Sequence, residues 1–223
     1  MDHADNNDDG IFVYKGGRAP LHITHARIDE SMDEIEDKAF DHCENLLTVE
    51  THDGIRRVRK QAFMWCKSLR LINLKSVVEI DDLAFLECDN LESVDFGDRL
   101  EMIGCMAFSH CKSLKHLKLP SVITIEAEAF SDSERMTDIE LSERLETIET
   151  QAFYNCKRLQ RIAIPLKRDL IAYDYIFDEY NQFDGCEQLT TVDLVGGIHK
   201  TVASLHMESW RTNMNKSINR INQ

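Results

Sequence analysis

Hydrophobic positions recur along the chain in one fixed pattern, at steps of 22 or 23 residues. An Ala-Phe pair marks each copy, and its phenylalanines are Phe40, Phe63, Phe85, Phe108, Phe130 and Phe153. An Ile or Val stands five residues before each Phe, and a Cys stands three residues after it, with Ser133 as the single substitution. Columns that stay in register over this length indicate stacked structural repeats.

The pattern predicts a solenoid of about seven coils of 22–23 residues, over residues 28–196. One copy is too short to enclose a core, whereas stacked copies place like residues above one another at about the 4.8 Å spacing of strands. Stretches such as Leu69 to Leu74 alternate apolar and polar residues, which predicts parallel strands on one face. The Ala-Phe-x-x-Cys stretches are expected to form short helical or 3-10 turns opposite them, so the predicted fold class is α/β.

A longer period of 45 residues lies within the short one, because steps of 22 and 23 alternate. The residue after the Cys column alternates in sign through Glu44, Lys67, Asp89, Lys112, Glu134, Lys157 and Glu187. We expect an edge ladder of ion pairs that disfavours a register slip of one coil. Each exposed pair is worth only about 0–1 kcal/mol, and the alternative is a solvated rim whose alternation is accidental.

The fourth copy, residues 103–120, reads IGCMAFSHCKSLKHLKLP. It resembles the BspA-type leucine-rich repeat, whose consensus runs Ile-Gly-x-x-Ala-Phe-x-x-Cys-x-x-Leu and then Leu-x-x-Ile-x-Leu-Pro. The resemblance implies a leucine-rich-repeat solenoid that binds other proteins, and it brings no catalytic residue. The family includes bacterial cell-surface adhesion proteins and many uncharacterised proteins of protists.

Segments with a different pattern flank the repeats. Residues 1–27 are expected to form an acidic tail and an N-terminal cap. At the other end Met207, Trp210, Met214 and Ile218 follow helical spacing, which predicts a basic amphipathic helix within residues 197–223. This helix would either cap the solenoid or offer Trp210 to a partner.

Two surfaces are candidates for binding a partner. The first is an aromatic insertion at 173–183, since 30 residues separate Phe153 from Phe183. Exposed aromatic residues form interface hot spots, and the candidates are Tyr173, Tyr175, Phe177 and Tyr180, together with Trp210. Alternatively, the aromatic residues fold inward and seal the last coil.

The second candidate is the strand face, meaning the outward positions of the predicted strands. Its predicted residues are Thr48, Glu50, Leu71, Asn73, Ser93, Asp95, His116, Lys118, Asp138, Glu140, Arg161, Thr191 and Asp193. They are mixed and mildly acidic without an aromatic stripe, so a generic solvated sheet is the alternative.

Charge and motifs narrow the function further. The formal net charge of −14 disfavours nucleic acid and anionic membranes as partners, because both would repel the chain. The column cysteines lack Cys-x-x-Cys pairs and are predicted to be buried structural thiols, whereas Cys105 lies off the column and is the thiol to test for reactivity. His22 and His25 form only a weak metal motif, and no nucleotide-binding or hydrolase motif occurs. We therefore expect no metal, no cofactor and no enzymatic activity.

The functional prediction is a non-enzymatic protein-binding scaffold. The first ten residues carry four Asp and no basic residue, the reverse of a secretory signal, so a cytoplasmic location is expected. The alternative is a cell-surface or secreted adhesion module, as in relatives of the resembled family. Neither the identity of a partner nor the oligomeric state follows from the sequence.

Overall fold

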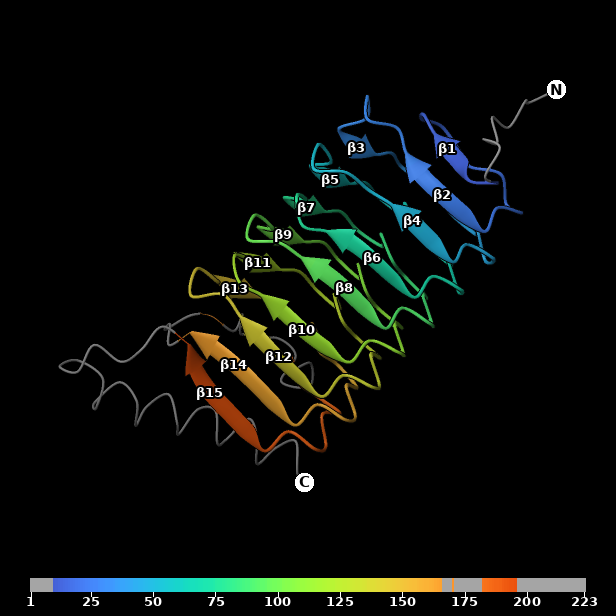
Figure 1. Ribbon diagram of the computed structural model, residues 1–223. Helices are drawn as coiled ribbons and strands as arrows, with labels where there is room; N and C mark the ends of the chain where they lie inside the picture. Colours follow the sequence, from blue (N-terminus) through green and yellow to red (C-terminus); the bar gives the residue numbers. More distant parts are fainter. Residues whose placement is uncertain (1–9, 166–169, 171–181, 196–223) are drawn as a thin grey trace.

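The structure is a computed structural model that describes residues 10–165, 170 and 182–195. The chain winds as a β-solenoid of about six turns, with coils of about 22 residues (Figure 1). The longer strands follow one another along the axis. They are β1 (Phe12–Tyr14), β2 (His25–Ile28), β4 (Thr48–Glu50), β6 (Leu71–Leu74), β8 (Ser93–Phe96), β10 (His116–Leu119), β12 (Asp138–Leu141), β14 (Arg161–Pro165) and β15 (Thr191–Val195). Their parallel pairing confirms the strands predicted on one face.

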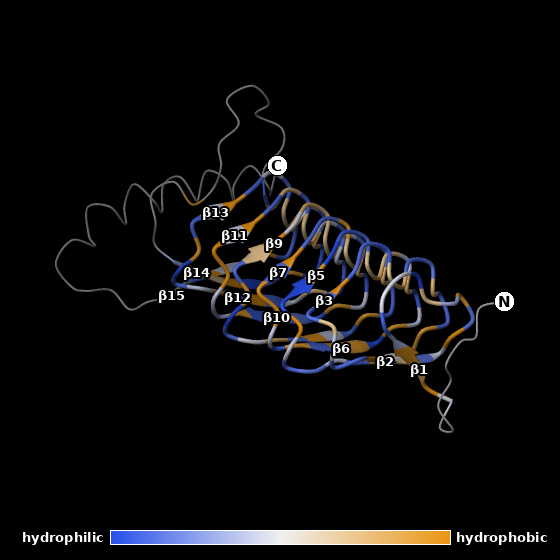
Figure 2. Cartoon of the chain, turned by 90° about the horizontal axis from the view of Figure 1, so that it is seen from above, coloured by the Kyte–Doolittle hydropathy of each residue, from blue (hydrophilic) through white to orange (hydrophobic). Residues whose placement is uncertain are grey.

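A second parallel sheet, which the sequence did not predict, stacks the column of Ile and Val residues that precede the phenylalanines. It has six strands of two residues each, namely β3 (Glu34–Ile35), β5 (Arg57–Val58), β7 (Glu79–Ile80), β9 (Met102–Ile103), β11 (Thr124–Ile125) and β13 (Thr147–Ile148). The second residue of each strand is buried and the first is half-buried. Figure 2 separates this row of short strands from the row of longer strands, and the turns stack along another edge.

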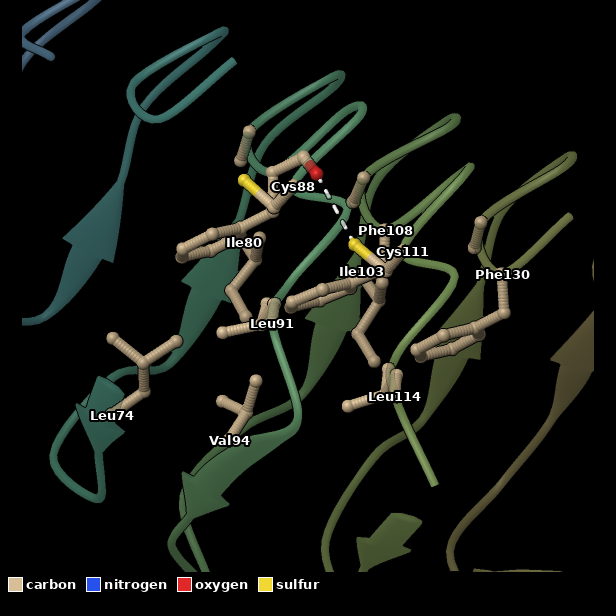
Figure 3. Close-up of a cluster of buried hydrophobic side chains, with 14 of the residues drawn as sticks. Leu74, Ile80, Cys88, Leu91, Val94, Ile103, Phe108, Cys111, Leu114 and Phe130 are labelled. Carbon is tan, nitrogen blue, oxygen red and sulfur yellow. Dashed lines mark hydrogen bonds between the residues drawn. The ribbon is translucent and has the colours of Figure 1, made fainter. Parts of the chain in front are cut away.

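The repeated phenylalanines form one continuous stack inside the coils, as the sequence predicts. Successive rings from Phe40 to Phe183 lie 4.9 to 5.4 Å apart between centroids and are nearly parallel, with interplanar angles of 1° to 11°. Figure 3 shows Phe108 and Phe130 in this stack, with Ile103 and Leu114 beside them. Each ring of the stack is at most 3% exposed, so the columns are the hydrophobic core.

The turns that carry these rings differ from the prediction, because the described residues contain no helix. Two residues in each coil, two positions before and two after the Phe, adopt left-handed backbone, as in Gln61 (φ 59°) and Trp65 (φ 64°). Every second N–H group of the turn points to the next coil, and the N–H groups between them donate to the carbonyl three residues back, as Met64 N–H does to Gln61 O at 3.2 Å. Phe63 N–H, for example, donates to Ala84 O at 2.7 Å, and Trp65 N–H donates to Leu86 O at 2.9 Å. These backbone hydrogen bonds join neighbouring coils, as they do between strands. The predicted helical or 3-10 turns are therefore wrong.

The N-terminal end of the ring stack is closed by Tyr14. Its ring centroid lies 5.0 Å from that of Phe40 at 42°, and its hydroxyl donates to Gly17 O at 3.0 Å. Burial raises the pKa of the Tyr14 phenol far above its usual range. The predicted acidic tail (residues 1–9) and the predicted C-terminal helix (197–223) lie outside the described residues.

Candidate partner-binding surface

The predicted aromatic candidates Tyr173, Tyr175, Phe177, Tyr180 and Trp210 lie outside the described residues. The described neighbours of the insertion nevertheless show which side of the solenoid it connects to. Leu170 O accepts a bond from Ile148 N–H of the second sheet at 2.8 Å, and Gln182 O accepts one from Phe153 N–H at 2.9 Å. The described residues on either side of the insertion thus bond to the second sheet at Leu170 and to the turns at Gln182. Phe183, the last residue of the insertion as predicted, is buried in the core.

The column cysteines are structural, and each thiol has a specific partner. From Cys66 onward each Sγ donates to the carbonyl of the Phe in the preceding coil, as from Cys111 to Phe85 O at 3.3 Å (Figure 3). Ser133 Oγ donates in the same way to Phe108 O at 3.4 Å. The column therefore holds small side chains that donate a hydrogen bond to the preceding coil. Burial raises the pKa of the Cys43 thiol to about 11, and it also raises the pKa of the thiols of Cys66, Cys88, Cys111 and Cys156. All seven cysteines are free.

Cys105, the thiol singled out for reactivity, is half-buried and lies among carboxylates. Burial raises the pKa of its thiol, and the nearby acids Asp82 and Glu128 raise it further. A thiol that stays protonated is a poor nucleophile, so the surroundings of Cys105 do not activate it. Its backbone N–H is shared by two carboxylates, Asp82 Oδ1 at 3.3 Å and Glu126 Oε2 at 3.0 Å.

Metal and membrane sites were examined in the described part of the chain. No group of three or more His, Cys, Asp or Glu side chains there has an arrangement that could hold a metal ion. Within the same residues no helix is long and apolar enough to cross a membrane.

The strand face is the candidate surface that the structure describes in full. Its predicted positions from Thr48 to Lys118 are exposed, and Asp138, Glu140 and Arg161 are half-buried. Its largest exposed apolar side chain is Leu71 on β6, at 60% exposure, and Leu47 lies just before β4 at 40%. The strand face is thus open to solvent over most of its length.

Ion pairs between neighbouring strands cover much of this face. Lys118 pairs with Glu140 at 3.4 Å, and Arg161 pairs with Asp193 at 2.7 Å. Further pairs join Arg27 to Glu50, Lys75 to Asp95 and His116 to Asp138. Cross-strand pairs of opposite charge favour the observed register of the coils.

The predicted edge ladder forms only in part. Lys67 pairs with Glu44 at 3.5 Å, Lys112 with Asp89 at 2.8 Å, and Lys157 with Glu134 at 3.0 Å. Each lysine thus binds the acid of the coil before it, and none of the three pairs with the acid of the coil after it within the described residues. The ladder consists of separate pairs with a period of two coils, where the sequence predicted a continuous row.

The alternation of charge extends over whole coils, a signal that the inspection of single columns missed. We number the coils as residues 33–55 (coil 1), 56–78 (coil 2), 79–100 (coil 3), 101–123 (coil 4) and 124–145 (coil 5). Coil 2 has seven basic residues and no acidic one, whereas coils 1 and 3 have eight acidic residues and one basic residue each. Arg59 of coil 2 lies 3.7 Å from Glu34 of coil 1 and 3.7 Å from Asp81 of coil 3. Coil 2 is therefore a basic layer held between two acidic layers.

The second sheet loses this balance after coil 3. Arg57, Arg59 and Lys60 of coil 2 are replaced at the same positions of coil 4 by Met102, Gly104 and Cys105. A side chain at Gly104 is excluded, because a Cβ there would lie 2.7 Å from the backbone of Asp82. Glu126 makes no ion pair among the described residues, and burial together with nearby Glu149 raises its pKa. This side of coils 4 and 5 keeps a carboxylate, that of Glu126, which pairs with no cation of the described residues.

These observations were compared with known proteins. The sequence profile of the BspA type leucine rich repeat region matches in six copies, over residues 20–125, 78–195 and 107–221. The chain belongs to this family. No curated protein matches the chain.

Two solved structures of leucine-rich repeat proteins are similar to this one. The leucine rich repeat protein of T. pallidum is 22% identical, with a TM-score of 0.52 over 92% of this chain and 90% of that one. A leucine rich cell surface protein from Faecalibacterium prausnitzii is 20% identical, with a TM-score of 0.50 over 78% of this chain. The BspA-type chain spans 60% of the length of the latter. At these identities the similarity concerns the fold.

Proposed function

We propose that this BspA-type chain is a non-enzymatic scaffold that binds a protein partner through its strand face. The observation that carries the proposal is the exposed row of strands from β4 to β10, which presents side chains at positions that repeat from coil to coil. Extended surfaces of this kind are what repeat solenoids use for binding. The family supports the same function, since leucine-rich repeats generally bind proteins.

The chemistry of the described residues supports a scaffold more than a catalyst. The column thiols are buried and hydrogen-bonded, and the pKa of Cys105 is raised by burial. The exposed histidine of the strand face, His116, is held by Asp138 and Thr137.

A second candidate is an adhesion module at the cell surface, in place of a cytoplasmic scaffold. It is favoured by the description of the Faecalibacterium prausnitzii structure as a cell surface protein. The free thiols do not separate the two locations, because buried thiols with raised pKa values resist oxidation in either compartment. Labelling of intact cells with a membrane-impermeant amine reagent separates them. Labelled chain supports the adhesion module, and chain that is labelled only after lysis supports the cytoplasmic scaffold.

Affinity purification with the full chain, followed by reconstitution from purified components, tests the scaffold function. A charge reversal at Lys118 on the strand face should weaken the reconstituted complex, whereas the same change at Lys38, on the turns, should not. Equal binding by both variants would remove the strand face from the proposal. Failure of every purified candidate to bind the wild-type chain would contradict the scaffold function itself.

A further inference from the structure

In coils 1 to 3, one cation on the strand side of the solenoid has no acidic partner among the described residues. We define the strand side as the residues from each column Cys to the end of the following long strand. In coils 1 to 3 its acids are Glu44, Glu50, Asp89, Glu92 and Asp95. All five are in ion pairs, with Lys67, Arg27, Lys112, Lys115 and Lys75 respectively. The strand side of these coils is therefore neutralised, except that Arg70 is left over.

The geometry of the ladder explains why Arg70 is left over. In the four residues that follow each column Cys, every ion pair joins a lysine to an acid of the preceding coil. Lys115 follows this rule and takes Glu92, which is the residue next to Arg70 in the following coil. The residue at the position of Arg70 in the preceding coil is Leu47, which has no charge to offer. Arg70 is exposed, and it makes no ion pair or side-chain hydrogen bond among the described residues.

The unpaired guanidinium lies beside two of the three large apolar side chains that are exposed in the described part of the chain. Leu47 occupies the same position one coil earlier, and Leu71 is the next residue along the chain. β4 and β6 are neighbours along the axis (Figure 1), so Leu47 and Arg70 occupy equivalent positions in adjacent coils, although the two strands are not hydrogen-bonded to each other. Thr48 and Ser93 flank Leu71 on either side and carry no charge. An uncharged patch with one free arginine at its edge is therefore built into coils 1 to 3.

We propose that Leu47, Arg70 and Leu71 form the centre of the partner-binding surface, and that they bind a peptide segment carrying a carboxylate next to an apolar side chain. The proposal rests on the scaffold function proposed above and names the chemistry of its partner. Arginine presents a fork of donors that fits a carboxylate, and arginine is enriched among the residues that dominate interface energies. Burying the patch in an interface should also cost little free energy of desolvation, because a partner bound there would break none of the ion pairs around it. Although this chain is acidic overall, we thus expect its partner segment to be acidic and apolar as well.

Selection of short random peptides displayed on phage, with the full chain as the target, tests this partner chemistry. The expected peptides carry Asp or Glu close to a Leu, Ile or Phe. Their affinity, measured by fluorescence polarisation, should fall about tenfold in Arg70→Glu, a loss typical of an interface hot spot. Leu71→Ala should weaken binding by a smaller factor, Arg70→Lys should retain part of it, and added salt should weaken the wild-type complex.

Arg158→Glu is the matched control, because Arg158 is also exposed and also makes no ion pair among the described residues. Arg158→Glu changes the net charge by the same amount as Arg70→Glu. The selected peptides should therefore bind Arg158→Glu as tightly as they bind the wild-type chain. Three results would overturn the proposal: equal losses in Arg70→Glu and Arg158→Glu, selection of basic peptides that bind Arg70→Glu undiminished, or no selected peptide at all. Basic peptides would indicate the carboxylates of the second sheet as the binding side. The scaffold function is judged separately by the reconstitution with purified partners.

Discussion

The strand side and the second sheet share one ring stack, yet they leave opposite charges unpaired. On the strand side of coils 1 to 3 every acid is in an ion pair, and the group left over is the Arg70 guanidinium. Beside the second sheet, coil 4 lacks the cations of coil 2, and the carboxylates of Glu126 and Glu149 make no ion pair with any residue that the structure describes. The net charge of −14 therefore does not indicate which charge is exposed on each surface. The charges that remain after intramolecular pairing determine the chemistry of a partner.

The largest expected effect comes from removing a ring of the stack on which both sides depend. Phe108→Ala leaves a cavity between Phe85 and Phe130 and should lower the free energy of unfolding by about 3–5 kcal/mol. Chemical denaturation of the full chain measures it, with the exposed Leu71→Ala as the control, expected within about 0.5 kcal/mol of the wild type. If Phe108→Ala were as stable as the wild type, the two sides would not share the stack.

The column cysteines should show a smaller effect that depends on the donor. Cys111→Ala removes volume and the bond to Phe85 O, and it should lower the free energy of unfolding by about 1–2 kcal/mol. Cys111→Ser keeps a donor, as Ser133 does in its own coil, and should lose less. The comparison of the two variants by thermal unfolding checks this. A serine variant less stable than the alanine variant would contradict a donor role.

The layered charges of coils 1 to 3 should stabilise the fold, and at Arg59, in the centre of the basic layer, we expect a contribution of about 1 kcal/mol to the free energy of unfolding. Arg59→Glu places a like charge beside Glu34, Asp37 and Asp81, so it should destabilise the chain, and the deficit should shrink in high salt. Arg158→Glu, without an ion pair to lose, should be nearly neutral. Equal unfolding midpoints for these two variants would mean that the layers do not stabilise the stack.

The smallest expected effect lies on the second sheet and depends on pH. The pKa of Glu126 in the folded chain is raised above its ordinary value of 4.5, first by burial, although the Cys105 N–H opposes the shift. A carboxyl with a raised folded pKa favours the folded state at low pH, and this advantage is lost as pH rises through the folded pKa. Glu126→Gln should therefore be slightly more stable than the wild type at neutral pH, and the gain should vanish in acid. Thermal unfolding across this pH range measures it, and a loss of stability at neutral pH would contradict the unpaired state of Glu126.

The repeat columns made the solenoid and its ring stack predictable, because side chains that recur at one period must meet when the coils stack. The backbone of the turns was not predictable in the same way. Residues such as Gln61 and Trp65 have no intrinsic preference for left-handed backbone, and bonds to the neighbouring coil impose it. The second sheet was missed because two-residue strands are too short to show an alternating pattern.

The candidate site was predictable only as a face. Leu71 was already among the outward positions of the strand face, but the importance of Arg70 depends on its lacking a partner, which only the arrangement of neighbouring charges reveals. The aromatic candidates Tyr173, Tyr175, Phe177, Tyr180 and Trp210 stay a prediction. The described ends of their segment connect to the second sheet and the turns.

The most direct test of a strand-side binding surface is amide hydrogen exchange on the full chain, with and without a bound, purified partner. The account predicts slower exchange at the strand-side segments of coils 1 to 3, residues 46–51, 69–75 and 91–96. Segments of the second sheet, such as residues 124–128, should exchange as in the free chain. Protection confined to those second-sheet segments, with the strand side unchanged, would contradict the account.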